Sequence, residues 1–188
     1  QRKGDSGEEH RLAWEDFPAT ALSKTYNTDA QTPDSAGTMT AITTGVKSHM
    51  GAIGVYAGDK NDCADSLGKH AQTWLELADA AGMAAGIVTT ARITHATPAA
   101  TYAHVPNRNW ENDAALPARA VAEGCRDIAQ QLIEATRGGR GPSIILGGGR
   151  KEFLTTAQAD PQQPDRRGMR RDGQDLVAAW RQARPQGA

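Results

Sequence analysis

Apolar residues in this chain form short runs and helix-like repeats, separated by polar and glycine-containing segments. Two runs with β-branched residues, "AGIVTT" at 85–90 and "SIILGGG" at 143–149, predict short buried strands. Stretches 66–82 and 116–135 have helical apolar spacing, and each precedes one of these strands. Alternating helices and strands at this spacing predict an α/β layer with parallel strands.

Each of the two predicted helices has an apolar face and a boundary signal. Gly82 is a plausible end for the first helix, and Pro117 suits the first turn of the second. The face of the first helix is expected to comprise Trp74, Leu77, Ala78 and Ala81. The stripe on the second is expected to comprise Val121, Cys125, Ile128 and Leu132.

The remaining segments are predicted more coarsely. Residues 1–16 are expected to form a short helix and loop, 19–27 a strand or extended entry, and 51–55 a short strand or turn. Polar loops are expected at 57–65 and 161–173, and the "QDLVAAW" run at 174–180 opens a final helix. The loop arginines Arg166, Arg167, Arg170 and Arg171 form a basic cluster, which is more often solvated than a binding patch, and the cluster stays unassigned.

Composition and charge limit the kinds of binding partner that the chain is expected to have. The chain has 188 residues, enough for one domain with a core, and a formal net charge of −1. The pI near 6.6 gives no electrostatic reason to expect nucleic acid or an anionic membrane. No apolar run approaches the length of a membrane span. The cysteines Cys63 and Cys125 fit no zinc or redox spacing, so free thiols and a disulfide both remain open.

The most informative stretch is 25–38, "TYNTDAQTPDSAGT", and within it Asp34 and Ser35. A turn containing Pro33 precedes the helical spacing of Met39, Ile42 and Val46, which places Ser35 at or next to a helix start. Free N–H groups and the helix dipole favour an anion there, either a serine alkoxide or a phosphate. From position alone, an ordinary N-cap is the commoner role for either residue.

Other reaction classes lack their motifs. The surroundings of Ser35 are not the G-x-S-x-G elbow of α/β-hydrolases, and no P-loop occurs. The Gly147–Gly149 run lacks the dinucleotide fingerprint and reads as a tight turn. The five histidines show no H-E-x-x-H pairing. Acyl transfer by a triad, nucleotide binding and zincin chemistry are therefore disfavoured.

A second stretch, 88–111, begins where a parallel strand should end, the edge at which α/β sheets gather ligands. In an extended segment His95 and Thr97 would point to the same side and could line a hard-cation site. Arg108 follows in a loop, and the planar guanidinium suits phosphate. Taken alone, all three would more often be ordinary loop residues.

Both stretches resemble one family. The segments "TYNTDAQTPDSAGTMTAITTGVKSHMGAIGV" and "THATPAATYAHVPNRNW" are similar to the alkaline phosphatases in motif order and spacing. "ILGGGRKEF" and "DGQDLVAAW" resemble the animal-type branch, so the likeness covers nearly the whole chain. It implies a three-layer α/β/α sandwich with a mainly parallel central sheet, of which residues 1–188 would be a single partial domain, an interior fragment of a larger one.

The resemblance assigns roles. Ser35 matches the serine that is phosphorylated during phosphate monoester hydrolysis, and it is also a zinc ligand. Arg108 matches the arginine that clamps the substrate phosphate, and Asp34, Ser35 and Arg108 are expected to form the substrate-binding site. Thr97 matches a magnesium ligand. His95 stands where family members carry Asp or His. The resemblance therefore implies a neutral imidazole at the magnesium site, acting directly or through water, which loosens that site.

The resemblance also implies two zinc ions and one magnesium ion, whose ligands fall mostly outside these residues. The isolated chain is therefore expected to have little or no activity, and the alternative is a non-catalytic phosphate-binding module. The family is exported, to the periplasm or the extracellular space, and its animal members carry a disulfide at positions like Cys63 and Cys125. A homodimer is implied for the full-length protein, with phosphate monoesters as substrates.

Overall fold

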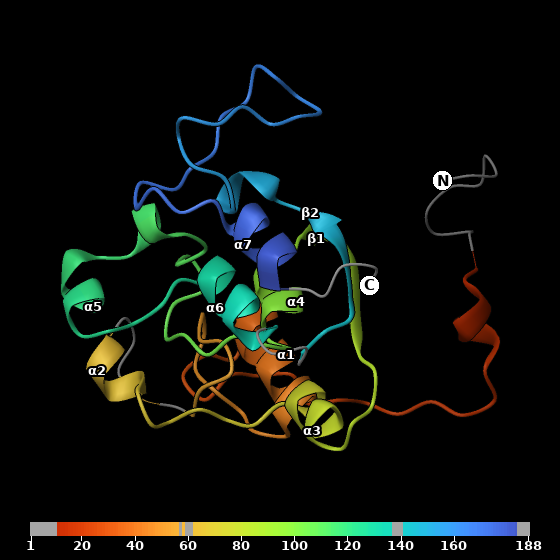
Figure 1. Ribbon diagram of the computed structural model, residues 1–188. Coiled ribbons are helices and arrows are strands. Elements are labelled where there is room, and N and C mark those ends of the chain that lie inside the picture. Colours follow the sequence, from red (N-terminus) through yellow and green to blue (C-terminus); the bar gives the residue numbers. More distant parts are fainter. Residues whose placement is uncertain (1–10, 57, 59–61, 137–140, 184–188) are drawn as a thin grey trace.

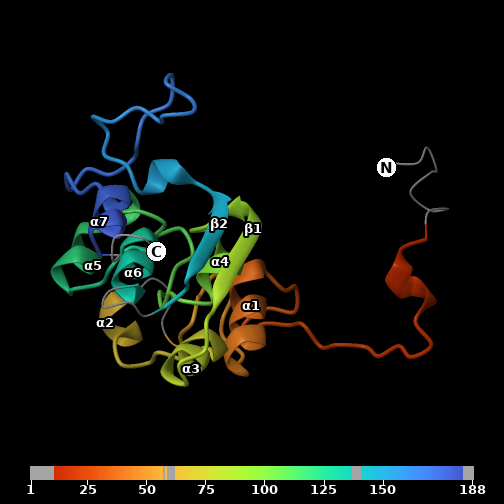
Figure 2. The same cartoon turned by 45° about the vertical axis from the view of Figure 1, so that its right-hand side comes forward.

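Two parallel strands and the helices beside them make up the body of the protein. The computed structural model describes residues 11–56, 58, 62–136 and 141–183. Strand β1 (Gly86–Arg92) pairs with β2 (Ile144–Gly148) in parallel, in the register Ile87 with Ile145. Figures 1 and 2 show helices α6 and α7 on one side of the strands. The expected α/β class and the positions and parallel pairing of both predicted strands are confirmed, but the prediction that the strands are buried is wrong, because most of their residues are exposed.

The helical elements are mostly short. Their bounds in chain order are η1 (Ala13–Asp16), α1 (Ser35–Thr44), α2 (Cys63–Ser66), α3 (Trp74–Ala80), α4 (Ala96–Ala99), η2 (Asp113–Ala115), α5 (Ala118–Ala122), α6 (Ile128–Ala135), η4 (Arg150–Glu152) and α7 (Leu176–Ala183). None of the helices formed by the described residues has both the length and the apolar composition needed to cross a bilayer.

The prediction of one continuous helix over 116–135 is wrong, because the structure has two separate helices there, α5 and α6. Gly124 adopts φ 90°, a left-handed conformation that separates α5 from α6. Helix α6 then starts afresh, because the Asp127 side chain accepts from Gln130 N at 2.9 Å as its N-cap. On the predicted stripe, Val121 is exposed, whereas Ile128 and Leu132 are buried in the core.

The predicted helix over 66–82 is also shorter than expected. Helix α3 starts only after Thr73, whose hydroxyl accepts from Glu76 N, while Glu76 accepts from Thr73 N in return. The predicted face is wrong as well, since Leu75 is the buried residue and both Trp74 and Leu77 are about half exposed. The capping box fixes where this short helix begins.

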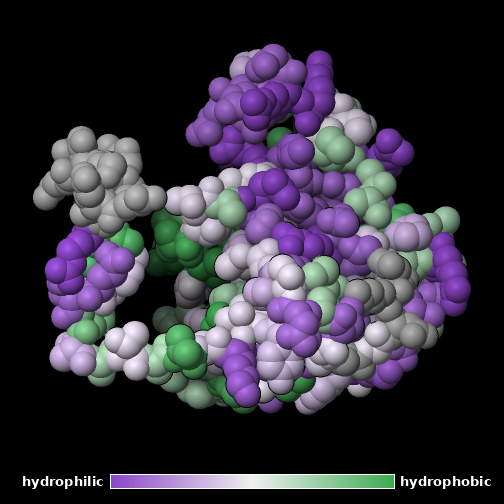
Figure 3. All heavy atoms as spheres, turned by 180° about the vertical axis from the view of Figure 1, so that it is seen from behind, coloured by the Kyte–Doolittle hydropathy of each residue, from purple (hydrophilic) through white to green (hydrophobic). Residues whose placement is uncertain are grey.

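The sheet is covered on one face only within the described residues. Ile87 is buried and packs into the core cluster with Ile93, Ile128 and Leu132. Side chains on the opposite face, Val88, Ile144 and Leu146, are exposed. Figure 3 shows an apolar area between the body and the N-terminal segment, seen from behind. Residues 11–23 are exposed and run away from the body, whereas Lys24 O and Tyr26 O accept hydrogen bonds from Lys47 Nζ. The strand considered for 19–27 does not form.

The disulfide question is decided by the structure. Cys63, the first residue of α2, is bonded to Cys125, which follows α5, with their Cα atoms 5.9 Å apart. The bridge joins positions 62 residues apart and ties α2 to the segment before α6. The disulfide implied by the family resemblance is confirmed.

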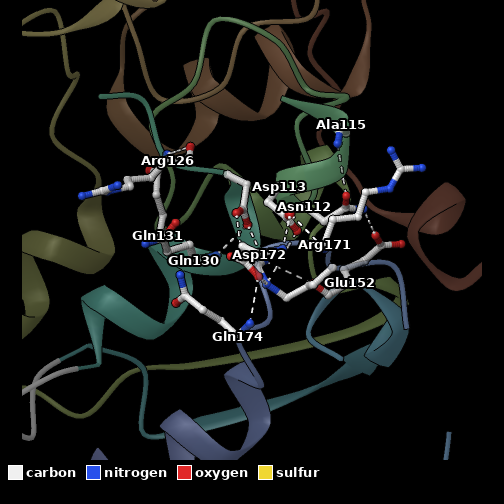
Figure 4. A network of polar contacts seen from close by, with 12 residues as sticks. Asn112, Asp113, Ala115, Arg126, Gln130, Gln131, Glu152, Arg171, Asp172 and Gln174 are labelled. Carbon is white, nitrogen blue, oxygen red and sulfur yellow. Dashed lines mark hydrogen bonds and ion pairs between the residues drawn. The ribbon is translucent and has the colours of Figure 1, made fainter. Parts of the chain in front are cut away.

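The loop 155–168 projects from the body in Figure 1 and returns to it through Arg170. The expectation of a solvated cluster is wrong for this arginine, which is fully buried. Its guanidinium donates to Asp127 Oδ1 and Oδ2 at 3.1 and 3.0 Å and also pairs with Asp172. Nearby, Asn112 donates to the buried Glu152 (Figure 4). Arg170 thus cross-links the end of the loop to the start of α6.

Candidate functional site

The site begins at the start of α1. The Asp34 side chain is the N-cap, because its Oδ1 accepts from Gly37 N at 3.0 Å. Ser35 is therefore the first residue of the helix, and its hydroxyl is not used as the cap. This resolves the alternatives at the turn: Asp34 is the capping residue, and Ser35 stands half-buried at the positive end of a ten-residue helix.

The first turn of α1 is tightly enclosed. Asn27 donates to Asp34 Oδ1 at 3.3 Å, and Gly51 N donates to Asp34 Oδ2 at 3.2 Å. A Cβ atom added at Gly37 would lie 2.4 Å from Asn27 Oδ1 and 3.0 Å from His49 O. Only glycine allows these neighbours to approach, so the "PDSAG" run is shaped by backbone packing as well as by chemistry.

Arg108 reaches this helix start from far along the chain. Its Nη1 donates to Asp34 Oδ2 at 3.2 Å, across 74 residues of sequence, and its backbone N donates to Gly51 O at 2.7 Å. The side chain of Arg108 is 27% exposed and that of Asp34 is 15% exposed. Arg108 therefore lies at the start of the helix whose first residue is Ser35, and its role in a shared site with Ser35 stays a prediction.

His95 touches the other end of the same guanidinium. Arg108 Nη2 lies 3.0 Å from His95 Nε2, and since arginine can only donate, Nε2 is the acceptor. Burial first, and then the charges of Arg108 and Arg92, lower the pKa of His95, so the neutral ring carries its proton on Nδ1. That Nδ1 is buried and has no hydrogen-bond partner among the described residues.

Thr97 is placed differently from the expectation. Strand β1 ends at Arg92, and His95 is the residue before the short helix α4, which contains both Thr97 and Pro98. Thr97 is exposed. The prediction of an extended segment with both side chains on one side is wrong, because a turn bonded from His95 N to Arg92 O starts the helix first.

The donors present do not by themselves complete a metal site. Among the described residues, no group of three or more His, Cys, Asp or Glu side chains is placed to hold a metal ion. A hydroxyl on α1, a hydroxyl on α4 and the unpartnered His95 Nδ1 are isolated donors rather than a coordination sphere. These residues alone therefore do not fit zinc or magnesium.

Sequence reasoning missed two parts of this region. Glu111 binds the Arg92 guanidinium through both oxygens, at 2.8 and 2.6 Å, and accepts from Thr94 Oγ1 at 2.6 Å. In a separate part of the fold, the ring of the exposed His70 stacks on that of His104, which is bonded to Gly54 O and Glu76. No motif in the sequence marks either arrangement.

The fold and the site together define an α/β protein in which a capped helix start presents a serine beside an arginine from a distant loop. A profile described as "Alkaline phosphatase" matches residues 1–187. The chain belongs to the alkaline phosphatase family.

Relatives extend this result. The tissue-nonspecific alkaline phosphatase of Gallus gallus is 48% identical over 187 residues, covering 96% of this chain and 35% of the relative. The membrane-bound alkaline phosphatase of Bombyx mori is 47% identical, over 96% and 33%. The chain thus spans about a third of the length of these curated relatives.

A solved structure agrees on the fold. A histidine-to-aspartate variant of the TAB5 alkaline phosphatase, with Mg bound in its M3 site, superposes with a TM-score of 0.65 at 25% identity. The superposition covers 95% of this chain and 39% of that one. The expected alkaline phosphatase-like α/β fold is confirmed by this match and by the family profile.

Proposed function

We propose that this chain supplies the nucleophile and the phosphate clamp of a phosphate monoesterase. The supporting observation is the shared carboxylate of Asp34, which caps the helix that begins with Ser35 and holds Arg108 at 3.2 Å. One side chain thereby joins the first turn of the helix that carries Ser35 to the guanidinium of Arg108. Membership of the alkaline phosphatase family supports the same reaction class.

In the proposed reaction, Ser35 Oγ attacks the phosphorus of a monoester. The P–O bond to the alcohol breaks, the alcohol leaves with a proton, and Ser35 loses its hydroxyl proton and becomes phosphoserine. Water then attacks the phosphorus, which releases inorganic phosphate and restores the hydroxyl. Arg108 donates hydrogen bonds to the non-bridging oxygens, whose charge it offsets as the attack proceeds.

The proposal includes the two zinc ions and the magnesium ion that the family resemblance implies. Ser35 would contribute one ligand to zinc and Thr97 one to magnesium, with His95 beside the latter, while most ligands of the two zinc ions and the magnesium ion would come from outside the 188 residues. When bound, such ions would lower the pKa of a coordinated hydroxyl and offset charge on phosphate. The isolated chain is expected to be nearly inactive for this reason.

Export and pairing are further parts of the proposal. The Cys63–Cys125 bridge suits an oxidising compartment, which supports a periplasmic or extracellular location. The apolar face of the sheet is exposed, and in this proposal further polypeptide of the same protein packs against it. A homodimer is proposed for the complete protein from the family alone.

The test extends the reading frame to a length like that of the relatives and assays it with a chromogenic phosphomonoester. Turnover should stop with a chelator, and acid quenching should trap a phosphoenzyme that Ser35→Ala cannot form. Labelling that persists in Ser35→Ala would refute the nucleophile. Phosphate binding without turnover would instead favour a non-catalytic phosphate-binding module. Ser23→Ala, in the exposed N-terminal segment, is the matched control.

A further inference from the structure

The carboxylate of Glu111 joins two chain segments that each carry a site residue. On one side it accepts three hydrogen bonds, two from Arg92 at the end of β1 and one from Thr94 in the turn that follows. On the other side it is part of the backbone segment that begins three residues earlier with Arg108. A bidentate arginine pair fixes direction as well as distance, so the contact restrains the relative orientation of the segments.

These contacts close a ring. Arg108 Nη2 lies 3.0 Å from His95 Nε2, and His95 N donates to Arg92 O at 2.9 Å. Arg92 returns through its side chain to Glu111, and the backbone returns to Arg108. The guanidinium that is proposed to clamp phosphate is therefore held at Nη2 by a histidine whose turn Glu111 fixes from behind.

Because the Glu111 carboxylate is largely buried, water cannot easily replace it as the hydrogen-bond acceptor for Thr94. Thr94 is fully buried, and the Glu111 side chain is 17% exposed. Burial alone would raise the pKa of Glu111, but hydrogen bonds from Arg92 and Thr94 lower it below its ordinary value, so the group is ionised at neutral pH. Without this acceptor, the Thr94 hydroxyl would be left buried and unpaired, and the turn would shift to satisfy it.

We propose that Glu111 is a positioning residue for the phosphate clamp: its contacts with Arg92 and Thr94 hold the His95 turn so that Arg108 keeps its binding orientation. This inference rests on the proposed function, because it assumes that Arg108 binds phosphate. Glu111 itself touches neither Ser35 nor Arg108 through any recorded side-chain contact between described residues, and acts through the turn.

The experiment measures the affinity of the 188-residue chain for inorganic phosphate, by titration followed with ¹⁵N NMR of the arginine Nε–H signals. Glu111→Gln, which keeps the shape but loses the charge and the bidentate pair, should weaken phosphate binding about three- to tenfold. The decisive readout is a double-mutant cycle, because a positioning role is exerted through Arg108. In an Arg108→Ala background, Glu111→Gln should have no further effect on phosphate affinity.

Two further variants guard the interpretation. Arg92→Met removes the same pair from a side chain that is 43% exposed, so folding should be retained and the loss of affinity should follow in the same direction. Glu123→Gln is the matched control: it weakens a Glu–Arg pair with a 2.6 Å contact to Arg119, a residue outside this ring, and should leave phosphate affinity unchanged.

The outcomes separate this inference from the proposed function. If the wild-type chain binds no phosphate, or if Arg108→Ala leaves its affinity unchanged, the proposed clamp is refuted and the inference falls with it. If Arg108→Ala weakens binding but Glu111→Gln and Arg92→Met do not, only the positioning role is overturned. A loss in Glu111→Gln that adds fully to that of Arg108→Ala also overturns it, because the effect would then bypass the clamp.

Discussion

Arg108 and Arg170 are both loop arginines beside aspartates, yet the fold uses them in opposite ways. Arg170 is fully buried, and its guanidinium is saturated by two oxygens each from Asp127 and Asp172. Arg108 is partly exposed and, among the described residues, has one carboxylate partner, Asp34. An arginine surrounded by carboxylates is a structural cross-link, whereas one with unsaturated charge at a helix start can take an anion.

The largest expected effect is the loss of stability when the Arg170 cross-link is removed. Arg170→Met leaves the Asp127 and Asp172 carboxylates without their cation, and should lower the free energy of unfolding by about 3–5 kcal/mol. Urea denaturation measures it. Arg171→Ala, the exposed neighbour, should change stability by less than about 0.5 kcal/mol.

A second variant keeps that test decisive. Adding Asp172→Asn to Arg170→Met removes one unpaired carboxylate, so part of the lost stability should return. A loss below about 1 kcal/mol in Arg170→Met would show that the buried cluster does not support the fold. Arg170 would then not be a structural cross-link, and its contrast with Arg108 would no longer hold.

The matching change at the site should affect binding more than stability. Arg108→Ala should weaken affinity for inorganic phosphate by at least about tenfold, the loss of a charge-assisted hydrogen bond, while changing the free energy of unfolding by less than about 1 kcal/mol. Phosphate titration and urea denaturation on the same preparations measure both. A large stability loss with unchanged phosphate affinity would make Arg108 a second cross-link.

His104 sharpens the comparison because its charge can be removed by pH. Burial lowers the pKa of His104, but hydrogen bonding to Glu76 and Gly54 O outweighs it and leaves the pKa above its ordinary value. Both ring nitrogens face acceptors, at 3.0 and 2.7 Å, so only the protonated ring donates to both.

A raised folded-state pKa sets the direction of the pH effect. The stabilisation should be complete below the unfolded pKa of about 6.5 and lost as pH rises through the folded value. Its size should be on the order of 1 kcal/mol. Urea denaturation across this range, comparing wild type with Glu76→Gln, should show a difference that fades at high pH.

The control for this pH effect lies in the same cavity of about 510 Å³, which Glu76, His104 and Glu134 all line. Glu134→Gln leaves the contacts of His104 intact and should leave the pH dependence unchanged. The stacked His70 has a pKa that burial, and then the charge on His104, lower, so it opposes the trend at acid pH. A pH-independent difference in Glu76→Gln would contradict the assignment.

The smallest expected effect is on stability, and it separates the two roles of Asp34, as the N-cap of α1 and as the carboxylate partner of Arg108. Asparagine is as good an N-cap as aspartate, so Asp34→Asn should cost no more than about 0.5 kcal/mol, whereas Asp34→Ala should cost about 1 kcal/mol. Thermal unfolding of the two variants measures the difference. Equal losses would mean that the charge contact with Arg108, rather than the cap, stabilises this helix start.

Local patterns predicted a good part of this fold. The β-branched runs gave both strands and their parallel pairing, and the turn before Ser35 gave the start of α1. Helix lengths failed where one residue overrode periodicity, at Gly124 with its left-handed backbone and at Thr73 with its capping box. The roles of Ser35, Arg108, Thr97 and His95 came from the family resemblance, and their chemistry stays a prediction.

The sequence by itself determined that a turn and a helix start lie at Asp34 and Ser35, because turn chemistry and helical spacing are local properties of a few neighbouring residues. Only the tertiary structure decided which arginine meets which carboxylate. Arg108 and Arg170 look alike in sequence, and their partners Asp34 and Asp127 lie 74 and 43 residues away. Burial and charge pairing depend on segments brought together by folding, so the contrast between an anion clamp and a cross-link appears only in three dimensions.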